Sequence, residues 1–297
     1  MKHTFFRVLL ATLVVSLACA TSYAEATAPK QRVVVSPGAV ELSLAPGESV
    51  TKYLTVVNKG TDSFKLNMTA ASYSVRDENY EPDYSLLPGA PDVTGWVSFT
   101  EPSRELSLAP EAVHEAVYTV TVPVDTKPGG YTVALFATTT PDPRTESVVV
   151  HNRVAVMHYI TVKGAAAESG EARAEPFEAL SWDGAFTLPF RVKNTGSTHF
   201  RVEVRTAIKT LWGREVAMLT KTRQVLPQTE RLVTLDWQST VPFGIYSVEQ
   251  SVVYLGKTEQ LSRRYLVVMH PAVALGIVLI LVSIGTLVLL RWKKRRF

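Results

Sequence analysis

The stretch from Arg76 to Gly95 holds the side chains of this sequence that are best suited to recognition. It reads RDENYEPDYSLLPGAPDVTG and is long for a connection within a compact β domain, and long loops are often functional. Its carboxylates could hold Ca²⁺, which prefers oxygen ligands, and tyrosine is a common contact residue. The candidate recognition residues are Asp77, Glu78, Tyr80, Glu81, Asp83, Tyr84 and Asp92.

Three interpretations of this stretch stay open at the level of the sequence. It could be a solvated acidic loop that packs Leu86 and Leu87 onto its domain, a contact site for a protein or a glycan, or a calcium site. No residue pattern elsewhere requires a metal ion, so no metal site is assigned.

Catalytic motifs are missing from the sequence. It contains no His-Glu-x-x-His zinc motif and no Gly-x-Ser-x-Gly nucleophile motif. Gly256-Lys257-Thr258 resembles the end of a phosphate-binding loop, but Ser251 stands where that loop needs a glycine. We therefore expect a protein that is not an enzyme and that binds no cofactor.

The histidines are interpreted as surface or core groups without a chemical role, and Trp96 as a core residue. His151 and His158 are separated by an odd number of positions, so one continuous strand would place them on opposite faces, where they could not share a metal ion. Trp96 is expected in the core because Val97 and Phe99 follow it in strand register. The places of Trp182 and Trp212 stay open.

The N-terminal segment must be set aside before the fold is considered. Residues 1–24 combine an early Lys2 and Arg7 with an apolar run and a small-residue ending at Ala24, which predicts a cleaved secretory signal. The only cysteine, Cys19, lies inside this segment. The mature chain would therefore have no disulfide and no thiol chemistry.

The C-terminal segment predicts a membrane anchor. Residues Ala272 to Leu290 are uncharged and apolar, and as a helix they would be about 28 Å long, close to the thickness of the hydrocarbon core of a bilayer. Five basic residues follow within 291–297 and mark the cytoplasmic side. We expect a single-pass protein of the cell membrane, bound to the lipid bilayer by one helix, with its N-terminal domains outside.

The net charge of +4 is misleading because charge is unevenly distributed. Two of the 31 basic residues lie in the signal and five in the tail, which leaves 24 basic against 27 acidic residues outside the membrane. A slightly acidic ectodomain gives no reason to expect nucleic acid as a partner.

The region between signal and anchor predicts an all-β fold with two immunoglobulin-like β-sandwich domains. Apolar residues alternate with polar ones in several short stretches, such as 116–122 and 186–193, and Pro and Gly separate these stretches. Asn58-Lys59-Gly60 is predicted as a hairpin-type turn. The expected segments are a signal at 1–24, a first sandwich at 25–163, a linker at 164–176, a second sandwich at 177–269, a transmembrane helix at 270–290 and a tail at 291–297.

The two units resemble each other in sequence. Val57-Asn58-Lys59-Gly60 with Phe64 is similar to Lys193-Asn194-Thr195-Gly196 with Phe200, and a Leu-Pro turn follows later in each unit. We interpret them as divergent copies. Since only Met269, His270 and Pro271 separate the last strand from the anchor, the second domain should stand close to the bilayer, with the first domain farther out on a flexible hinge.

The first unit also resembles a known family. Its order of turn and strand motifs is similar to that of the WxL-interacting proteins of bacterial surfaces, and to that of immunoglobulin-like modules of exported sugar-active enzymes. These motifs include Ser36-Pro37-Gly38, Leu44-Ala45-Pro46-Gly47-Glu48, Gly95-Trp96-Val97 and Pro128-Gly129-Gly130-Tyr131. The resemblance covers about 31–162 and implies a cell-envelope role. By this resemblance the first domain would contact peptidoglycan and the second a partner surface protein.

Two functional hypotheses follow. The first is a membrane-anchored binding or scaffold protein of the bacterial cell envelope that contacts peptidoglycan and a surface protein. The alternative is a chaperone-like or accessory subunit of an exported surface assembly, because two-domain sandwiches can take up a partner by edge-strand addition.

Overall fold

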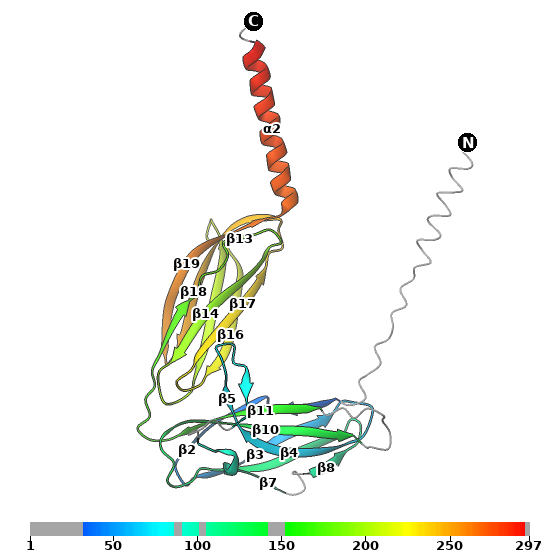
Figure 1. The fold of residues 1–297 in the computed structure, drawn as a ribbon, viewed down its shortest axis with the longest axis vertical. Helices are drawn as coiled ribbons and strands as arrows, with labels where there is room; N and C mark the ends of the chain where they lie inside the picture. The colour runs from blue at the N-terminus through cyan, green and yellow to red at the C-terminus, as the bar shows by residue number, and fades with distance from the viewer. Residues whose placement is uncertain (1–31, 86–90, 101–104, 142–151, 295–297) are drawn as a thin grey trace, which may run out of the picture.

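The computed structural model describes residues 32–85, 91–100, 105–141 and 152–294, and the predicted signal lies outside these residues. Two β-sandwich domains follow each other and a single long helix extends from the second (Figure 1). The predicted fold class, tandem immunoglobulin-like sandwiches with one C-terminal apolar helix, is confirmed.

The first domain packs a four-stranded sheet, ordered β1-β3-β9-β7, against a five-stranded sheet, ordered β2-β11-β10-β4-β8. A separate two-stranded hairpin, β5-β6, leaves the domain between β4 and β7. The elements are β1 Val33–Ser36, β2 Ala39–Leu44, β3 Ser49–Asn58, β4 Phe64–Ser72, β5 Ser74–Val75, β6 Pro82–Asp83, the 3₁₀ turn η1 Thr94–Trp96, β7 Val97–Phe99, β8 Glu105–Leu108, β9 Val113–Thr121, β10 Gly129–Pro141 and β11 Arg153–Val162.

Alternation in the sequence sets the core of the first domain. Along β9, Ala116, Tyr118 and Val120 are fully buried, while the residues between them are not. Strand β10 departs from the alternation because Val133, Leu135 and also Phe136 are buried. Trp96 is buried as predicted.

The second domain pairs a three-stranded sheet, ordered β12-β14-β17, with a five-stranded sheet, ordered β13-β19-β18-β15-β16. Its core includes the fully buried Leu188, Phe190 and Val202, again at the alternating positions that the sequence predicts. The strands are β12 Gly170–Ala174, β13 Leu180–Ser181, β14 Ala185–Asn194, β15 Phe200–Thr210, β16 Glu215–Val225, β17 Glu230–Gln238, β18 Phe243–Tyr254 and β19 Lys257–Met269.

Both domains share one topology. In each domain the first strand, β1 or β12, pairs antiparallel with a strand of the smaller sheet, β3 or β14. The next strand, β2 or β13, pairs parallel with the last strand of the larger sheet, β11 or β19. The remaining strands correspond in order, and the first domain differs by the insertion of β5, β6 and β7. The interpretation as divergent copies therefore agrees with the strand order.

A buried asparagine occupies the same corner in both copies. The Asn58 side chain donates to the carbonyl oxygens of Asp62 (2.9 Å) and Leu108 (3.1 Å), and Asn194 donates to those of Thr198 (2.8 Å) and Val225 (2.9 Å). The prediction of a hairpin at Asn58-Lys59-Gly60 was wrong. Strands β3 and β4 belong to different sheets, so their connection crosses the sandwich, and the Asn58 side chain joins this connection to the end of β8.

The predicted linker at 164–176 is only partly a linker. Residues Gly170–Ala174 form β12, which pairs with β14 and so belongs to the second domain. Ahead of this strand, Ala167 and Ser169 bond with the main chain of the loop at 195–197. Small residues fit here because a Cβ on Gly196 would lie 2.4 Å from the Ala167 carbonyl oxygen. Residues 167–174 are therefore bonded to the second domain and do not form the flexible hinge that the sequence predicted.

The C-terminal helix α2 runs from Pro271 to Lys294. Residues Pro271–Leu289 are long and apolar enough to cross a membrane, and none of this stretch is buried against the described protein. The helix begins directly after β19, with the Val273 and Ala274 N–H groups bonded to the His270 carbonyl oxygen.

Replacing the corner asparagine of the second domain should cost stability. Asn194→Ala leaves the carbonyl oxygens of Thr198 and Val225 without their buried donor, and we expect a loss of about 3 kcal/mol of unfolding free energy. Urea unfolding of the full chain in detergent measures it. Asn67→Ala, at an exposed position on β4, is the control and should change little; equal losses in both variants would contradict the role of the corner.

A buried histidine makes the first domain sensitive to acid. His158 is fully buried, its Nδ1–H donates to the Val156 carbonyl oxygen (3.2 Å), and its Nε2 accepts from the Tyr118 hydroxyl (2.6 Å). Burial lowers the pKa of His158 from 6.5 to about 4. Since the unfolded chain binds the proton first, stability should be complete above about pH 6.5 and fall by about 3 kcal/mol as the pH approaches 4.

Urea unfolding of the full chain between pH 4 and pH 7.5 tests this expectation. His158→Gln keeps an acceptor for the Tyr118 hydroxyl but cannot take up a proton, so its stability should depend less steeply on pH over this interval. The same slope in the variant and the parent would show that another group is responsible.

Candidate functional site

The hairpin β5-β6 of the first domain contacts the second domain. It rises from the first domain beside the lower end of the second (Figure 1). Its turn is shaped by Asp77, whose carboxylate accepts from the N–H groups of Asn79 (2.9 Å) and Glu81 (3.2 Å). The turn holds Tyr80 at a φ of 65°, a backbone conformation that non-glycine residues rarely adopt. This geometry directs the Tyr80 side chain toward the second domain.

Tyr80 belongs to the core of the second domain although it comes from the first. Its hydroxyl accepts from the Leu226 N–H (2.8 Å) and lies 2.5 Å from the Thr229 hydroxyl oxygen. Thr229 donates to the Leu226 carbonyl oxygen, so the Tyr80 hydroxyl donates to Thr229. The guanidinium of Arg231 lies 3.9 Å from the centre of the Tyr80 ring. Burial raises the pKa of Tyr80, which keeps the phenol neutral.

We call the contact of the hairpin residues Glu78 and Tyr80 with the second domain the joint. Main-chain and ionic contacts of Glu78 add to those of Tyr80. The Leu232 N–H donates to the Glu78 carbonyl oxygen (2.7 Å), so the hairpin turn bonds to β17. The Glu78 carboxylate pairs with Arg191, which also contacts Glu230 (2.8 Å) and Glu175 (2.7 Å). These three carboxylates raise the pKa of Arg191, and the hydrogen bond that Arg191 donates to Glu78 is the largest cause.

A second set of contacts lies at the base of β10 and β11. The Gly130 N–H donates to the Ser197 carbonyl oxygen (2.8 Å), and a Cβ at Gly130 would come within 2.8 Å of the His199 nitrogen. Glycine is therefore required here for the two main chains to approach. Tyr159 packs on His199 with ring centres 5.5 Å apart. Glu41 accepts from Gln224 (2.5 Å) and pairs with Arg201.

The structure distributes the predicted recognition residues over several roles. Glu78 and Tyr80 bind the second domain, and Asp77 shapes the turn. Asp83 accepts from Ser85 and pairs with Arg76 (3.2 Å), contacts that lower the pKa of Asp83 to about 2. Further placements are Glu81 beside Arg76, Tyr84 edge-on to Phe136, and Asp92 bonded to Ser72 and Thr94.

The calcium interpretation gains no support from this arrangement. Within the described ranges, no three His, Cys, Asp or Glu side chains come together as a metal site would require. Asp77, Asp83 and Asp92 already accept hydrogen bonds from protein donors. The predicted packing of Leu86 and Leu87 lies outside the described residues.

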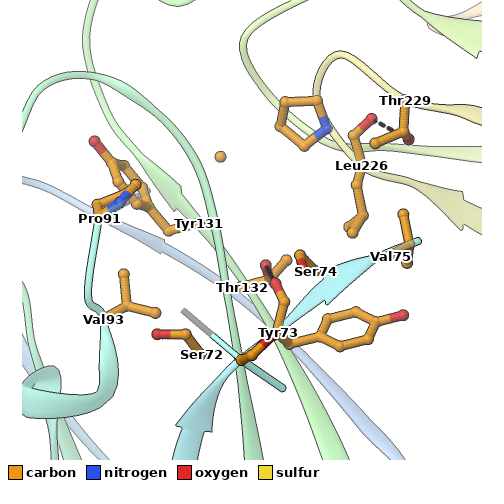
Figure 2. Close-up of a pocket in the computed structure, with 13 residues that line it drawn as sticks. Ser72, Tyr73, Ser74, Val75, Pro91, Val93, Tyr131, Thr132, Leu226 and Thr229 are labelled. Atoms are coloured by element: carbon orange, nitrogen blue, oxygen red, sulfur yellow. Dashed lines mark hydrogen bonds between the residues drawn. The ribbon is translucent and has the colours of Figure 1, made fainter. Parts of the chain in front are cut away.

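A groove of about 300 Å³ opens between the domains next to the hairpin. Figure 2 shows Ser74 and Val75 of β5 facing Leu226 and Thr229 of the second domain, with Thr132 of β10 beside Ser74 and Tyr131 beside Pro91. Each residue that lines it is uncharged. The lining consists of Ser72, Tyr73, Ser74, Val75, Ser85, Pro91, Val93, Gly130, Tyr131, Thr132, Leu226, Pro227 and Thr229.

Sequence reasoning located one wall of this groove and missed the other. The length of the 76–95 stretch pointed to the hairpin, but nothing in the sequence indicated that Leu226, Thr229 and Arg231 would receive it. The turn at Pro227-Gln228, which receives the hairpin, resembles the turn at Pro110-Glu111 in the first domain. Gln228 and Glu111 each follow a proline and each have a positive φ, so no distinct motif marks the turn at Pro227-Gln228.

No protein-family model matches the chain, and a search of curated proteins finds no match. The similarity to WxL-interacting proteins therefore stays a prediction. Solved structures with a similar arrangement include the class 5 fimbriae chaperone CfaA, at 11% identity over 78% of this chain and 99% of that chain, with a TM-score of 0.40. The YadV chaperone has 9% identity over 79% and 99%, with a TM-score of 0.41. The E. coli chaperone DraB has 13% identity over 80% and 97%, with a TM-score of 0.38.

Scores and identities this low carry no argument about activity or partners. The assignment of two immunoglobulin-like sandwiches rests on the strand order of each domain.

The joint should loosen when the Tyr80 hydroxyl is removed. Tyr80→Phe keeps the ring under Arg231 but leaves the buried Leu226 N–H without an acceptor, at a cost of about 2 kcal/mol. Spin labels on cysteines at Val113 and Val216, which are both exposed, should report a broader distance distribution between the domains. Tyr53→Phe, on an exposed ring, is the matched control; an unchanged distribution in Tyr80→Phe would contradict the role of this hydroxyl.

Proposed function

We propose that this protein is a non-enzymatic, membrane-anchored binding protein that takes an extended segment of an exported protein into the groove between its domains. In this role it would serve a surface assembly as an accessory or chaperone-like subunit. The observation that carries the proposal is an uncharged groove bordered by an open strand edge and held by a fixed joint.

Anchoring is supported by α2 and by the residues around it. Its apolar stretch is exposed along its length in the protein alone, which a soluble protein would not tolerate. The basic residues after it favour a cytoplasmic C-terminus, with both sandwiches on the outer side. A predicted secretory signal at 1–24 agrees with this orientation.

The lining of the groove suits an uncharged, extended occupant. Val75, Pro91, Val93 and Leu226 offer apolar contact, and the serine and threonine hydroxyls can exchange hydrogen bonds with peptide groups. A charged polymer would have to leave its charges unpaired here. The rings that could stack on a sugar are already engaged, because Tyr131 packs on Trp96 (4.9 Å between centres) and Tyr73 on Tyr84 (6.0 Å). These features favour a protein segment over peptidoglycan.

Strand β5 provides a main-chain edge at which such a segment could add. It pairs only with β6, so its other edge carries no strand among the described residues. By contrast, side chains bridge the free edges of β16 and β17. Lys221 donates to the Thr234 carbonyl oxygen (2.9 Å), and Arg231 donates to that of Gln224 (2.6 Å).

Capture experiments with groove variants test the proposal. The full chain, purified in detergent, is incubated with envelope extract from the source cells and, separately, with insoluble peptidoglycan. Val75→Asp places a charge on the groove wall and should weaken retention of an exported protein by about tenfold or more, which corresponds to at least about 1.4 kcal/mol. Val113→Asp, at an exposed position on β9, should retain the protein like the parent.

The outcomes separate the two hypotheses for function. An exported protein that is lost with Val75→Asp and kept with Val113→Asp supports the groove as the binding site. Retention on peptidoglycan that Val75→Asp does not change would replace this proposal with the cell-wall scaffold. Equal binding of the exported protein by both variants would place its contact elsewhere on the protein.

A further inference from the structure

The end of the second domain next to α2 is formed by three turns, 182–184, 211–214 and 239–242. They lie at one end of the sandwich because β18 begins opposite the end of β19, with Phe243 paired to Met269, and because Thr210 at the end of β15 pairs with Tyr246. Ser239 bonds to the Gly184 carbonyl oxygen (2.9 Å). We call these three turns together with Phe243 the rim.

Large apolar side chains project from the rim into solvent. Trp212 is 92% exposed, and Leu211 and Trp182 are both more than half exposed. Val241 and Phe243 complete the group at 42% and 48%. In the described part of the first domain, by contrast, the exposed large apolar residues are Val34, Tyr53, Val113 and Val124, which lie on separate strands or loops. A concentration of exposed apolar side chains at one end indicates an interaction surface.

The projection of Trp212 is built into an ordered turn. The Gly213 N–H donates to the Thr210 carbonyl oxygen (2.9 Å), and the Thr210 N–H donates to that of Arg214 (2.8 Å). Gly213 has a φ of 80°, which a side chain would strain. The indole is therefore held outward by the backbone and is not the tip of a loose loop.

The rim has a fixed position relative to the helix. Strand β19 ends at Met269 and α2 begins at Pro271, and the intervening His270 donates its N–H to the Pro242 carbonyl oxygen (2.7 Å). Figure 1 shows the helix leaving the same end of the domain that carries β13. If the apolar part of α2 fills the hydrocarbon core, this short connection brings the rim to the level of the lipid headgroups.

We propose that the rim inserts into the headgroup and acyl boundary of the outer leaflet of the bilayer that α2 spans. This inference rests on the proposed membrane anchoring. Tryptophan prefers this boundary because its ring is apolar and its N–H is polar, and Arg214 beside Trp212 can reach the lipid phosphates. Helix and rim together form two attachments, which fix the tilt of the second domain and, through the joint, the direction in which the groove faces.

Spin-label depth measurements on the full chain in phosphatidylglycerol–phosphatidylethanolamine vesicles test the inference. With Cys19 replaced by serine, single cysteines at Trp212, Val113 and Leu281 carry the nitroxide. Collisions with lipid-soluble oxygen, relative to a water-soluble nickel chelate, should be several-fold more frequent at 212 than at Val113, and most frequent at Leu281. An equal ratio at 212 and Val113 would overturn the inference, as would a label at 212 shielded from both reagents.

The helix label separates this inference from the anchoring on which it rests. A deep label at Leu281 with a water-exposed label at 212 would support the membrane anchor and contradict only the insertion of the rim. A water-exposed label at Leu281 would contradict the proposed membrane anchoring itself. As a second measurement, brominated lipids should quench the tryptophan fluorescence of the unlabelled protein more strongly than that of a Trp182→Phe, Trp212→Phe variant; equal quenching would contradict the inference.

Discussion

The burial of Tyr80 in the core of the neighbouring domain ties the two sandwiches together. A residue of the first domain completes the core of the second, and its hydroxyl satisfies the Leu226 N–H at the turn between β16 and β17. Removing the contact would leave a buried main-chain donor unpaired, so the hairpin and the turn hold each other in place. This contact joins the two domains that supply the walls of the groove.

Sequence reasoning succeeded where structure is set by local pattern. Alternation placed Tyr118 and Phe190 in their cores, and the apolar run after Pro271 formed the expected helix. It failed where long-range packing decides. The Asn58 corner has the residue types of a tight turn, yet its buried side chain reaches Leu108 across the sandwich. The small, charged stretch at 164–176 lacked strand-forming residues, yet β14 offered an edge on which Gly170–Ala174 could pair. For the candidate site, the acidic stretch was located, but not the second domain that receives it.

Comparison of the two domains separates the features that both share from those that only one of them carries. Both have the asparagine corner and the pairing of the first two strands in different sheets, which the sandwich requires. Among the described residues, only the first domain carries the hairpin and β7, and the hairpin supplies one wall of the groove. The second copy carries the exposed aromatic rim and the helix. Partner binding and membrane attachment are thus proposed for opposite ends of the second domain, one at the joint with the first domain and one beside α2.

The most direct test of the groove as a binding site is photocrosslinking in living cells. A benzophenone amino acid at Val75, in the otherwise unchanged full chain, should form an adduct with one exported protein upon irradiation, while the same amino acid at Val113 should not. Identical adduct patterns at the two positions, or adducts at Val113 alone, would contradict the account.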